Sequence, residues 1–181
     1  MRILTSQSAT FEQELDDLLA FETVNDPKLL ATVDDIIAQV RQGGDDVVLK
    51  LTQQFDNHPG KTFDELIIAQ DTLKHAFDDL SSEVKSALEL SAKRIQTFHQ
   101  QQVQHSWTYQ DELGNTLGQQ ITSLDKVGIY VPGGLASYPS SVLMNAIPAK
   151  VAGVGEIIMV VPAPNGKLNP LVLAAAYLAG V

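Results

Sequence analysis

The stretch VGIYVPGGLASYPSSVLMNAIPAKVAGVGEIIMVVP, residues 127–162, decides the fold class. Two apolar runs rich in β-branched residues predict strands, and the segment that follows each run has helical character. The predicted order of strand, helix, strand and helix occupies about residues 127–131, 140–152, 157–161 and 170–178. Continuously apolar strands in this order are typical of a parallel sheet covered on both faces. Pro148, inside the first of these helices, is expected to kink or divide it.

The loop after the first strand, YVPGGLASYPSS, is the part of this stretch that bears on function. Ligands of open α/β sheets bind beyond the carboxyl ends of the strands, so a cofactor would lie there. Glycine lets the backbone approach a phosphate closely, and a helix start offers free N–H groups to an anion. The alternative, which the spacing alone favours, is a plain turn followed by an N-cap. Gly133-Gly134 completes neither G-x-G-x-x-G nor a P-loop, and Ser140 and Ser141 lack the context of a nucleophile, so capping is their expected role.

Upstream of this stretch the sequence predicts mainly helices. Apolar residues recur at helical spacing, and the predicted helices occupy about residues 11–19, 27–40, 46–55, 71–80 and 82–104. Gly43-Gly44 is expected to end the second of them, and Ser81 or Ser82 to cap the last. A short strand is predicted at residues 66–69. A hairpin is predicted from residues 107–110 and 117–121, joined through Gly114-Asn115.

Charge is distributed unevenly along the 181 residues, whose formal net charge is -10. Residues 1–120 carry nine basic and twenty acidic side chains, whereas residues 121–181 carry three and two. Six of the eight prolines also lie after residue 120, so the composition predicts two structural units that join near residues 123–126. The acidic balance argues against nucleic-acid and membrane partners, because both need a basic face.

Residue types that are missing exclude further classes of site. The sequence holds no Cys, which excludes disulfides, thiolate catalysis and Cys-ligated zinc and fits a reducing cytoplasm. No apolar run reaches about 18 residues, and the N-terminus lacks the pattern of a signal peptide. The spacing of the four histidines does not match a metal-binding motif. Neighbouring acidic residues on a helix point about 100° apart, so these acidic side chains are expected to face solvent. The residues alone indicate a possible cofactor loop, no catalytic residue and no metal ligand.

Three segments carry a resemblance to a known family: VRQGGDDVVLKLTQQFD at residues 40–56, RIQTFHQQQ at residues 94–102, and the whole of residues 127–181. On these segments, and above all on YVPGG and YPSSVLMNAIPAKVAGV, the chain resembles histidinol dehydrogenase. The resemblance implies a zinc enzyme of histidine biosynthesis that oxidises L-histidinol to L-histidine through a bound aldehyde, using two NAD molecules in turn. It also implies a homodimer with one zinc per subunit.

The fold implied by the resemblance is α/β. A helical N-terminal region is followed by an incomplete Rossmann-like, aldehyde-dehydrogenase-like parallel βαβα unit. The expected domains are an N-terminal helical arm, a helix-rich α/β region that is part of a first Rossmann-like domain, and the truncated first half of an NAD-binding Rossmann-like domain, at residues 1–24, 25–126 and 127–181.

The resemblance also implies where NAD would bind. Tyr130 matches the NAD-contacting tyrosine of the family. Four further residues would shape the same cofactor pocket: Pro132, Gly133, Gly134 and Pro139. The zinc ligands of the family and its catalytic Glu-His pair match nothing in this sequence and are expected in segments beyond residue 181.

Two hypotheses about function follow. In the first, the chain is the amino-terminal part of a longer histidinol dehydrogenase and, alone, is inactive or binds NAD weakly. In the second, it is a stand-alone, non-catalytic module that binds a protein partner. A two-stranded parallel sheet would leave an unpaired edge and an uncovered apolar face, so self-association is expected in either case.

Overall fold

The computed structural model describes residues 3–19, 27–133 and 138–181. The chain divides into two compact units, Met1–Val48 and Leu49–Val181. Within the described ranges, no helix is long and apolar enough to span a lipid bilayer. The domain limits expected at residues 24 and 126 stay a prediction.

The first unit contains α1 (Phe11–Leu19) and the first part of α2 (Pro27–Asp56). α2 is broken at Gly44, whose φ of 57° and ψ of -140° lie in a region that glycine enters easily. The predicted helix end at Gly43-Gly44 is therefore confirmed as a break between two helical stretches. Large apolar side chains of this unit, among them Leu29 and Val33, are exposed.

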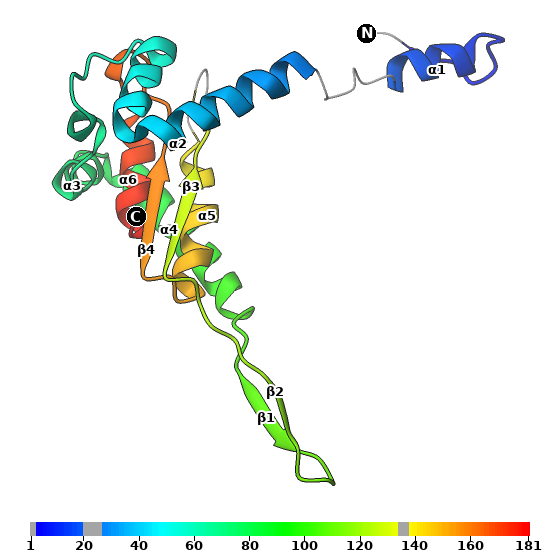
Figure 1. Cartoon of the computed structure of the whole chain (residues 1–181), viewed down its shortest axis with the longest axis vertical. Helices are drawn as coiled ribbons and strands as arrows, with labels where there is room; N and C mark the ends of the chain where they lie inside the picture. Colours follow the sequence, from blue (N-terminus) through cyan, green and yellow to red (C-terminus); the bar gives the residue numbers. More distant parts are fainter. Residues whose placement is uncertain (1–2, 20–26, 134–137) are drawn as a thin grey trace. The chain divides into compact units, whose positions relative to one another are not determined.

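The second unit holds the remaining elements, whose α-helices and β-strands are labelled in Figure 1. They are η1 (Phe63–Leu66), α3 (Gln70–Asp78), α4 (Ser82–Gln100), β1 (Trp107–Gln110), β2 (Thr116–Gln119), β3 (Lys126–Tyr130), α5 (Pro139–Val151), β4 (Glu156–Val160), η2 (Pro164–Gly166) and α6 (Pro170–Ala179). The Ser81 hydroxyl accepts a hydrogen bond from the Val84 N–H at 3.4 Å, so the predicted cap of α4 is confirmed. The helix ends at Gln100, one turn before the predicted end.

The strand predicted at residues 66–69 is wrong. The structure has a short 3-10 helix, η1, that ends at Leu66, and Ile67 after it is extended with φ of -83° and ψ of 123°. Ile67 and Ile68 have the residue type of a strand, but a strand also needs a neighbour that takes up its backbone hydrogen bonds. No strand in the described part of the chain pairs with this segment.

β3 and β4 form the predicted parallel pair, with Val127 beside Ile157 and Tyr130 beside Val160. Side chains alternate between the two faces of this pair, as they must in a strand. One face is buried or half-buried, whereas the other is exposed along its whole length. The expectation of a sheet covered on both faces is therefore wrong for this chain, although the uncovered apolar face expected of a two-stranded sheet is present.

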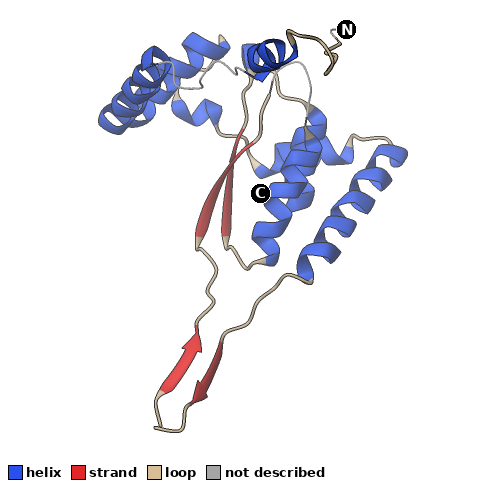
Figure 2. Ribbon diagram, turned by 90° about the vertical axis from the view of Figure 1, so that its right-hand side faces the viewer, coloured by secondary structure: helices blue, strands red, loops and turns tan. Residues whose placement is uncertain are grey.

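The covered face packs against α5 and α6, and Figure 2 shows α4 on the far side of these two helices. α6 is apolar all round, which is typical of a buried helix. It lies between α3 and α5 and buries six of its residues: Val172, Leu173, Ala174, Ala175, Ala176 and Ala179. Alanine has a small side chain, so the backbones of neighbouring helices can approach closely at these positions.

α5 continues to Val151 although Pro148 lies inside it, so the predicted division is wrong. Pro148 is in the last turn, where its missing N–H removes one hydrogen bond. The end of the helix is closed by hydrogen bonds from the Ala152 N–H to the Pro148 carbonyl at 2.9 Å and from the Val154 N–H to the Ala149 carbonyl at 3.0 Å. α5 therefore continues to Val151 although the hydrogen bond that the Pro148 nitrogen would donate is missing.

The predicted hairpin is confirmed as β1 and β2, which pair antiparallel. Its turn is built on Asp111, whose Oδ1 accepts hydrogen bonds from the N–H groups of Leu113 and Asn115 at 2.9 and 2.8 Å. Asp111 Oδ2 accepts a third from the Asn115 side chain at 2.9 Å. These hydrogen bonds hold the pKa of Asp111 below its ordinary value of 3.8. The bond from the Asn115 side chain has the largest effect.

The lowered pKa of Asp111 predicts an acid-sensitive turn. Because the pKa is depressed in the folded turn, the stabilisation is complete above the ordinary value and is lost as pH falls through the depressed one. In an NMR titration, the amide protons of Leu113 and Asn115 should shift together, with a midpoint below 3.8. In Asp111→Asn the joint shift should vanish. A midpoint at or above the ordinary value would contradict the prediction.

Candidate functional site

The carboxyl ends of β3 and β4 form the edge of the sheet where ligands of open α/β folds bind. The Val131 N–H donates to the Val160 carbonyl at 3.0 Å, which extends the strand pairing by one residue. Val131 is completely buried, whereas Tyr130 points to the open face with 63% of its surface exposed. Tyr130 lies beside Val160, which is also exposed, so an aromatic and an aliphatic side chain form an open apolar surface at this edge.

Gly133 lies in the loop after β3, against the loop after β4. A Cβ placed on Gly133 would lie 3.2 Å from the Cβ of Pro162 and 3.3 Å from the other two ring carbons, Cγ and Cδ. These separations are tighter than ordinary van der Waals contact, so a side chain at this position would require the Pro162 ring to shift by a few tenths of an ångström. The absence of a side chain at Gly133 therefore lets the loops that follow β3 and β4 meet.

α5 begins after this loop with Tyr138 as its N-cap and Pro139 as its first residue. Proline suits the first helical position because the N–H that it lacks would have no partner in the helix. The expected capping role of Ser140 and Ser141 is wrong, since both lie inside the first turn. The N–H groups of Ser141 and Val142 point to the Tyr138 carbonyl at 3.0 and 3.4 Å, which reduces the number of donors left for an anion.

The residues expected at a cofactor site are thus partly brought together. Tyr130, Pro132 and Gly133 follow one another at the carboxyl end of β3. Pro139 opens α5, the helix that follows the same loop. Gly134 lies outside the described residues.

A second pair of residues, which the sequence analysis missed, holds the loop after β4. The Asn57 side-chain NH2 donates to Asn165 Oδ1 at 2.8 Å, across 108 positions of sequence. Both residues have positive φ, 50° for Asn57 and 56° for Asn165, a conformation that asparagine tolerates better than most residues. Asn165-Gly166 is a recognisable turn signal, but no local pattern could show that its partner is Asn57.

The segment that carries Asn57 is itself held in place. The Gly60 N–H donates to His58 Nδ1 at 3.0 Å, and the Gln53 side chain donates to the Gly60 carbonyl at 2.7 Å. A Cβ placed on Gly166 would lie 2.9 Å from the Pro59 ring, so the two segments are in close contact. Residues 57–60 therefore form a support for the loop at the carboxyl end of β4.

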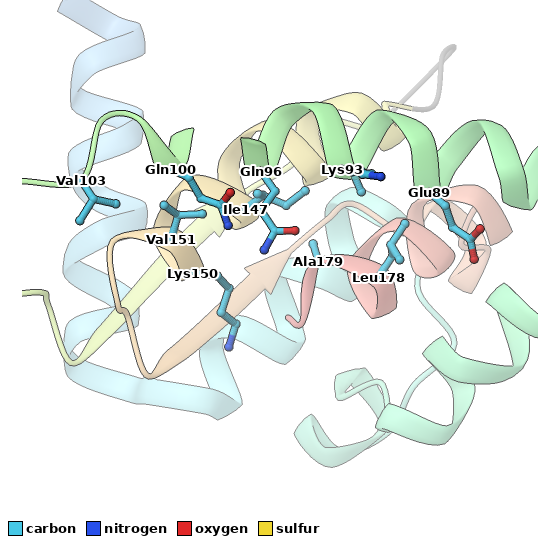
Figure 3. A pocket seen from close by; sticks show the side chains of 11 residues that line it. Glu89, Lys93, Gln96, Gln100, Val103, Ile147, Lys150, Val151, Leu178 and Ala179 are labelled. Carbon is cyan, nitrogen blue, oxygen red and sulfur yellow. The ribbon is translucent and has the colours of Figure 1, made fainter. Parts of the chain in front are cut away.

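A groove of about 410 Å³ lies between α4, α5 and α6 (Figure 3). Its lining includes Lys93 and Gln96 of α4, Ile147 and Lys150 of α5, and Leu178 of α6. The residues from α5 and α6 belong to the C-terminal halves of those helices, which lie at the amino ends of the strands. The groove is therefore at the opposite end of the sheet from Tyr130, and Lys150 has a position that the C-terminal end of a helix dipole favours.

No group of three His, Asp or Glu side chains able to hold a metal ion is present within residues 3–19, 27–133 and 138–181. His58 is the histidine with a defined structural contact near the carboxyl end of the sheet, and its Nδ1 is an acceptor there. The described residues therefore do not fit a zinc ion.

Comparison with known proteins identifies the family. The sequence profile of the histidinol dehydrogenase family matches residues 20–181. The chain belongs to the histidinol dehydrogenase family. It is 70% identical to the histidinol dehydrogenase of Acinetobacter baylyi and 67% identical to that of Psychrobacter arcticus, each over all 181 residues. A crystal structure of histidinol dehydrogenase from Elizabethkingia anophelis superimposes with a TM-score of 0.80 over 93% of this chain, at 26% identity.

The chain spans only part of its histidinol dehydrogenase relatives. It covers 42% of the length of the Acinetobacter and Psychrobacter proteins and 39% of the Elizabethkingia chain. The resemblance stated on residues 40–56, 94–102 and 127–181 is confirmed by these matches. The α/β fold with a parallel βαβα unit is likewise confirmed.

The Asn57–Asn165 contact predicts a distinctive pair of variants. Asn165→Ala loses the hydrogen bond and places alanine at positive φ, so it should destabilise the chain by about 1–2 kcal/mol. Asn165→Gly loses the same bond but relieves the backbone strain, so its free energy of unfolding should stay within about 0.5 kcal/mol of the wild type. Urea unfolding measures both. Equal losses in the two variants would contradict a contribution from backbone strain.

Proposed function

We propose that this chain is the amino-terminal part of an NAD-dependent oxidoreductase that converts L-histidinol to L-histidine through the aldehyde. The observation that carries the proposal is the match to histidinol dehydrogenases over the whole chain, for example at 70% identity to the Acinetobacter protein. The structure agrees with a role in cofactor binding, because it has a parallel strand pair with an open carboxyl edge. A non-catalytic interaction module remains the alternative, and NAD binding distinguishes the two.

In this proposal the cofactor site includes Tyr130, Pro132, Gly133, Gly134 and Pro139. The exposed ring of Tyr130, beside Val160, offers a flat apolar surface to a planar ring of the nucleotide. Gly133 contributes by having no side chain, since this allows the loop to lie against Pro162. NAD, when bound, supplies the hydride acceptor, and these residues bind and orient it.

The proposal assigns catalysis and the zinc ion to the longer family protein, because the resemblance places the zinc ligands and the catalytic Glu-His pair of the family outside this sequence. The proposed domains are the helical arm at residues 1–24, the α/β region at residues 25–126 and the first half of the NAD-binding domain at residues 127–181. The proposal includes a cytoplasmic location and self-association as a homodimer.

Binding of NAD by the isolated chain should depend on Tyr130. Tyr130→Ala removes the exposed aromatic surface at the carboxyl edge of the sheet and should weaken NAD binding about tenfold, measured by calorimetric titration. Tyr109→Ala is the matched control, because Tyr109 is similarly exposed, with 54% of its surface accessible, but lies on the hairpin. Equal affinities of the wild type and Tyr130→Ala would contradict the assigned role.

Activity should be absent from the isolated chain. With L-histidinol, NAD and added zinc, the purified 181-residue protein should form no NADH above a protein-free blank. A full-length relative such as the Acinetobacter enzyme, assayed in parallel, is the positive control. Zinc-dependent NADH formation by the isolated chain would show that its own residues complete an active site.

A further inference from the structure

The loop that follows β4, residues 161–168, is held by turns rather than by burial. Residues 164–167 are exposed. The Gly166 N–H donates to the Ala163 carbonyl at 2.8 Å, which closes a tight turn. Asn165 and Gly166 have successive positive φ angles of 56° and 70°. Because little of this loop is buried, its position depends on the segments that it touches on either side.

One side of the loop touches the proposed cofactor site. β3 ends at Tyr130 and β4 at Val160, and these two residues lie beside each other in the strand register. A Cβ placed on Gly133, in the loop after β3, would lie 3.2 Å from the Cβ of Pro162, so the two loops are in close contact. A displacement of Pro162 therefore changes the space next to the residues that follow Tyr130.

The other side of the loop is held by residues 57–60, which follow α2. The Asn57 side-chain NH2 donates to Asn165 Oδ1 at 2.8 Å, across 108 positions of sequence. A Cβ placed on Gly166 would lie 2.9 Å from the Cδ of Pro59, so the backbone of the loop lies directly against this segment. Both segments belong to the same compact unit. The Asn57–Asn165 hydrogen bond thus connects the loop after β4 to a support outside the sheet.

Stability alone does not explain this hydrogen bond. Asn57 and Asn165 are both exposed, so water competes for the same donor and acceptor and the net stabilisation is small. Both residues also have positive φ, which costs free energy in any residue other than glycine. Backbone strain of this kind persists where the surrounding structure requires it, and it is concentrated at binding sites and active sites. The placement of the loop is therefore the better explanation for the pair.

We infer that Asn57 and Asn165 are positioning residues of the cofactor site. Their hydrogen bond fixes the loop of residues 161–168, and this loop in turn holds Pro162 against Gly133 in the arrangement to which NAD binds. A loop that is already ordered loses less conformational entropy when the cofactor binds, so the effect of the bond appears in NAD affinity. The inference rests on the proposed function, because it assigns these two residues a role in NAD binding.

Asn165→Gly separates positioning from stability. The variant removes the acceptor of the hydrogen bond, and glycine accepts positive φ, so the free energy of unfolding in urea should match that of the wild type. Its dissociation constant for NAD, measured by calorimetric titration, should nevertheless rise about fivefold. In hydrogen exchange without NAD, the Gly166 amide should exchange faster than in the wild type, because the loop has lost its support.

Two further variants test the hydrogen bond itself. Asn57→Gly removes the donor, and combining it with Asn165→Gly should weaken NAD binding no further than either change alone, because both changes remove the same bond. Asn165→Asp keeps an oxygen acceptor and tolerates positive φ, so it should bind NAD within about twofold of the wild type at an ionic strength that screens its charge. Additive losses in the double variant would overturn the inference, and so would an Asn165→Asp protein as weak as Asn165→Gly.

Asn115→Gly is the matched control. The Asn115 side chain likewise donates one hydrogen bond in an exposed turn, to Asp111 Oδ2 at 2.9 Å, but that turn belongs to the hairpin of β1 and β2. Its NAD affinity should equal that of the wild type. If Tyr130→Ala weakens NAD binding and Asn165→Gly does not, the inference is overturned and the proposed cofactor site stands. If the wild type itself binds no NAD, both are overturned.

Discussion

The parallel pairing of β3 with β4 is the constraint on which the second unit depends. Parallel neighbours cannot be joined by a tight turn, so the chain must cross over, and α5 is that crossover. The helix can return along the strands only by burying an apolar face against them, which explains why Val142, Leu143 and Ala146 are inaccessible or nearly so. α6 then completes the layer, and its alanines allow it to lie closely between α3 and α5.

The same pairing creates the candidate site. The chain emerges from both strands at one edge, so the loop after β3 and the loop after β4 must lie side by side. Gly133 permits that contact with Pro162, and Asn57 holds the second loop through Asn165. Tyr130 is left on the open face because side chains alternate along a strand and its neighbour Val131 takes the buried position.

Surfaces without a partner are the second consequence of this architecture. One face of the strand pair is bare, although at one end the side chains of Lys126 and Glu156 form an ion pair across the two strands. The hairpin of β1 and β2 exposes a second apolar surface with open edges. Both surfaces are rich in apolar and aromatic residues, which are typical of protein interiors and interfaces. The Acinetobacter and Psychrobacter relatives are more than twice as long as this chain.

Local sequence determined most of the elements of this protein. Runs of β-branched residues predicted β3 and β4. Gly44 marked a helix break, Ser81 a helix cap and Gly114 a turn. Each of these effects depends on only a few neighbouring residues, so local sequence is enough to predict it. Tertiary structure alone decided the rest. Ile67 and Ile68 are not a strand because no strand in the described part of the chain lies beside them, and Asn57 meets Asn165 because the fold brings distant turns together. An apolar residue in a strand indicates that burial is favourable, but only the neighbouring elements determine which face of the sheet is covered.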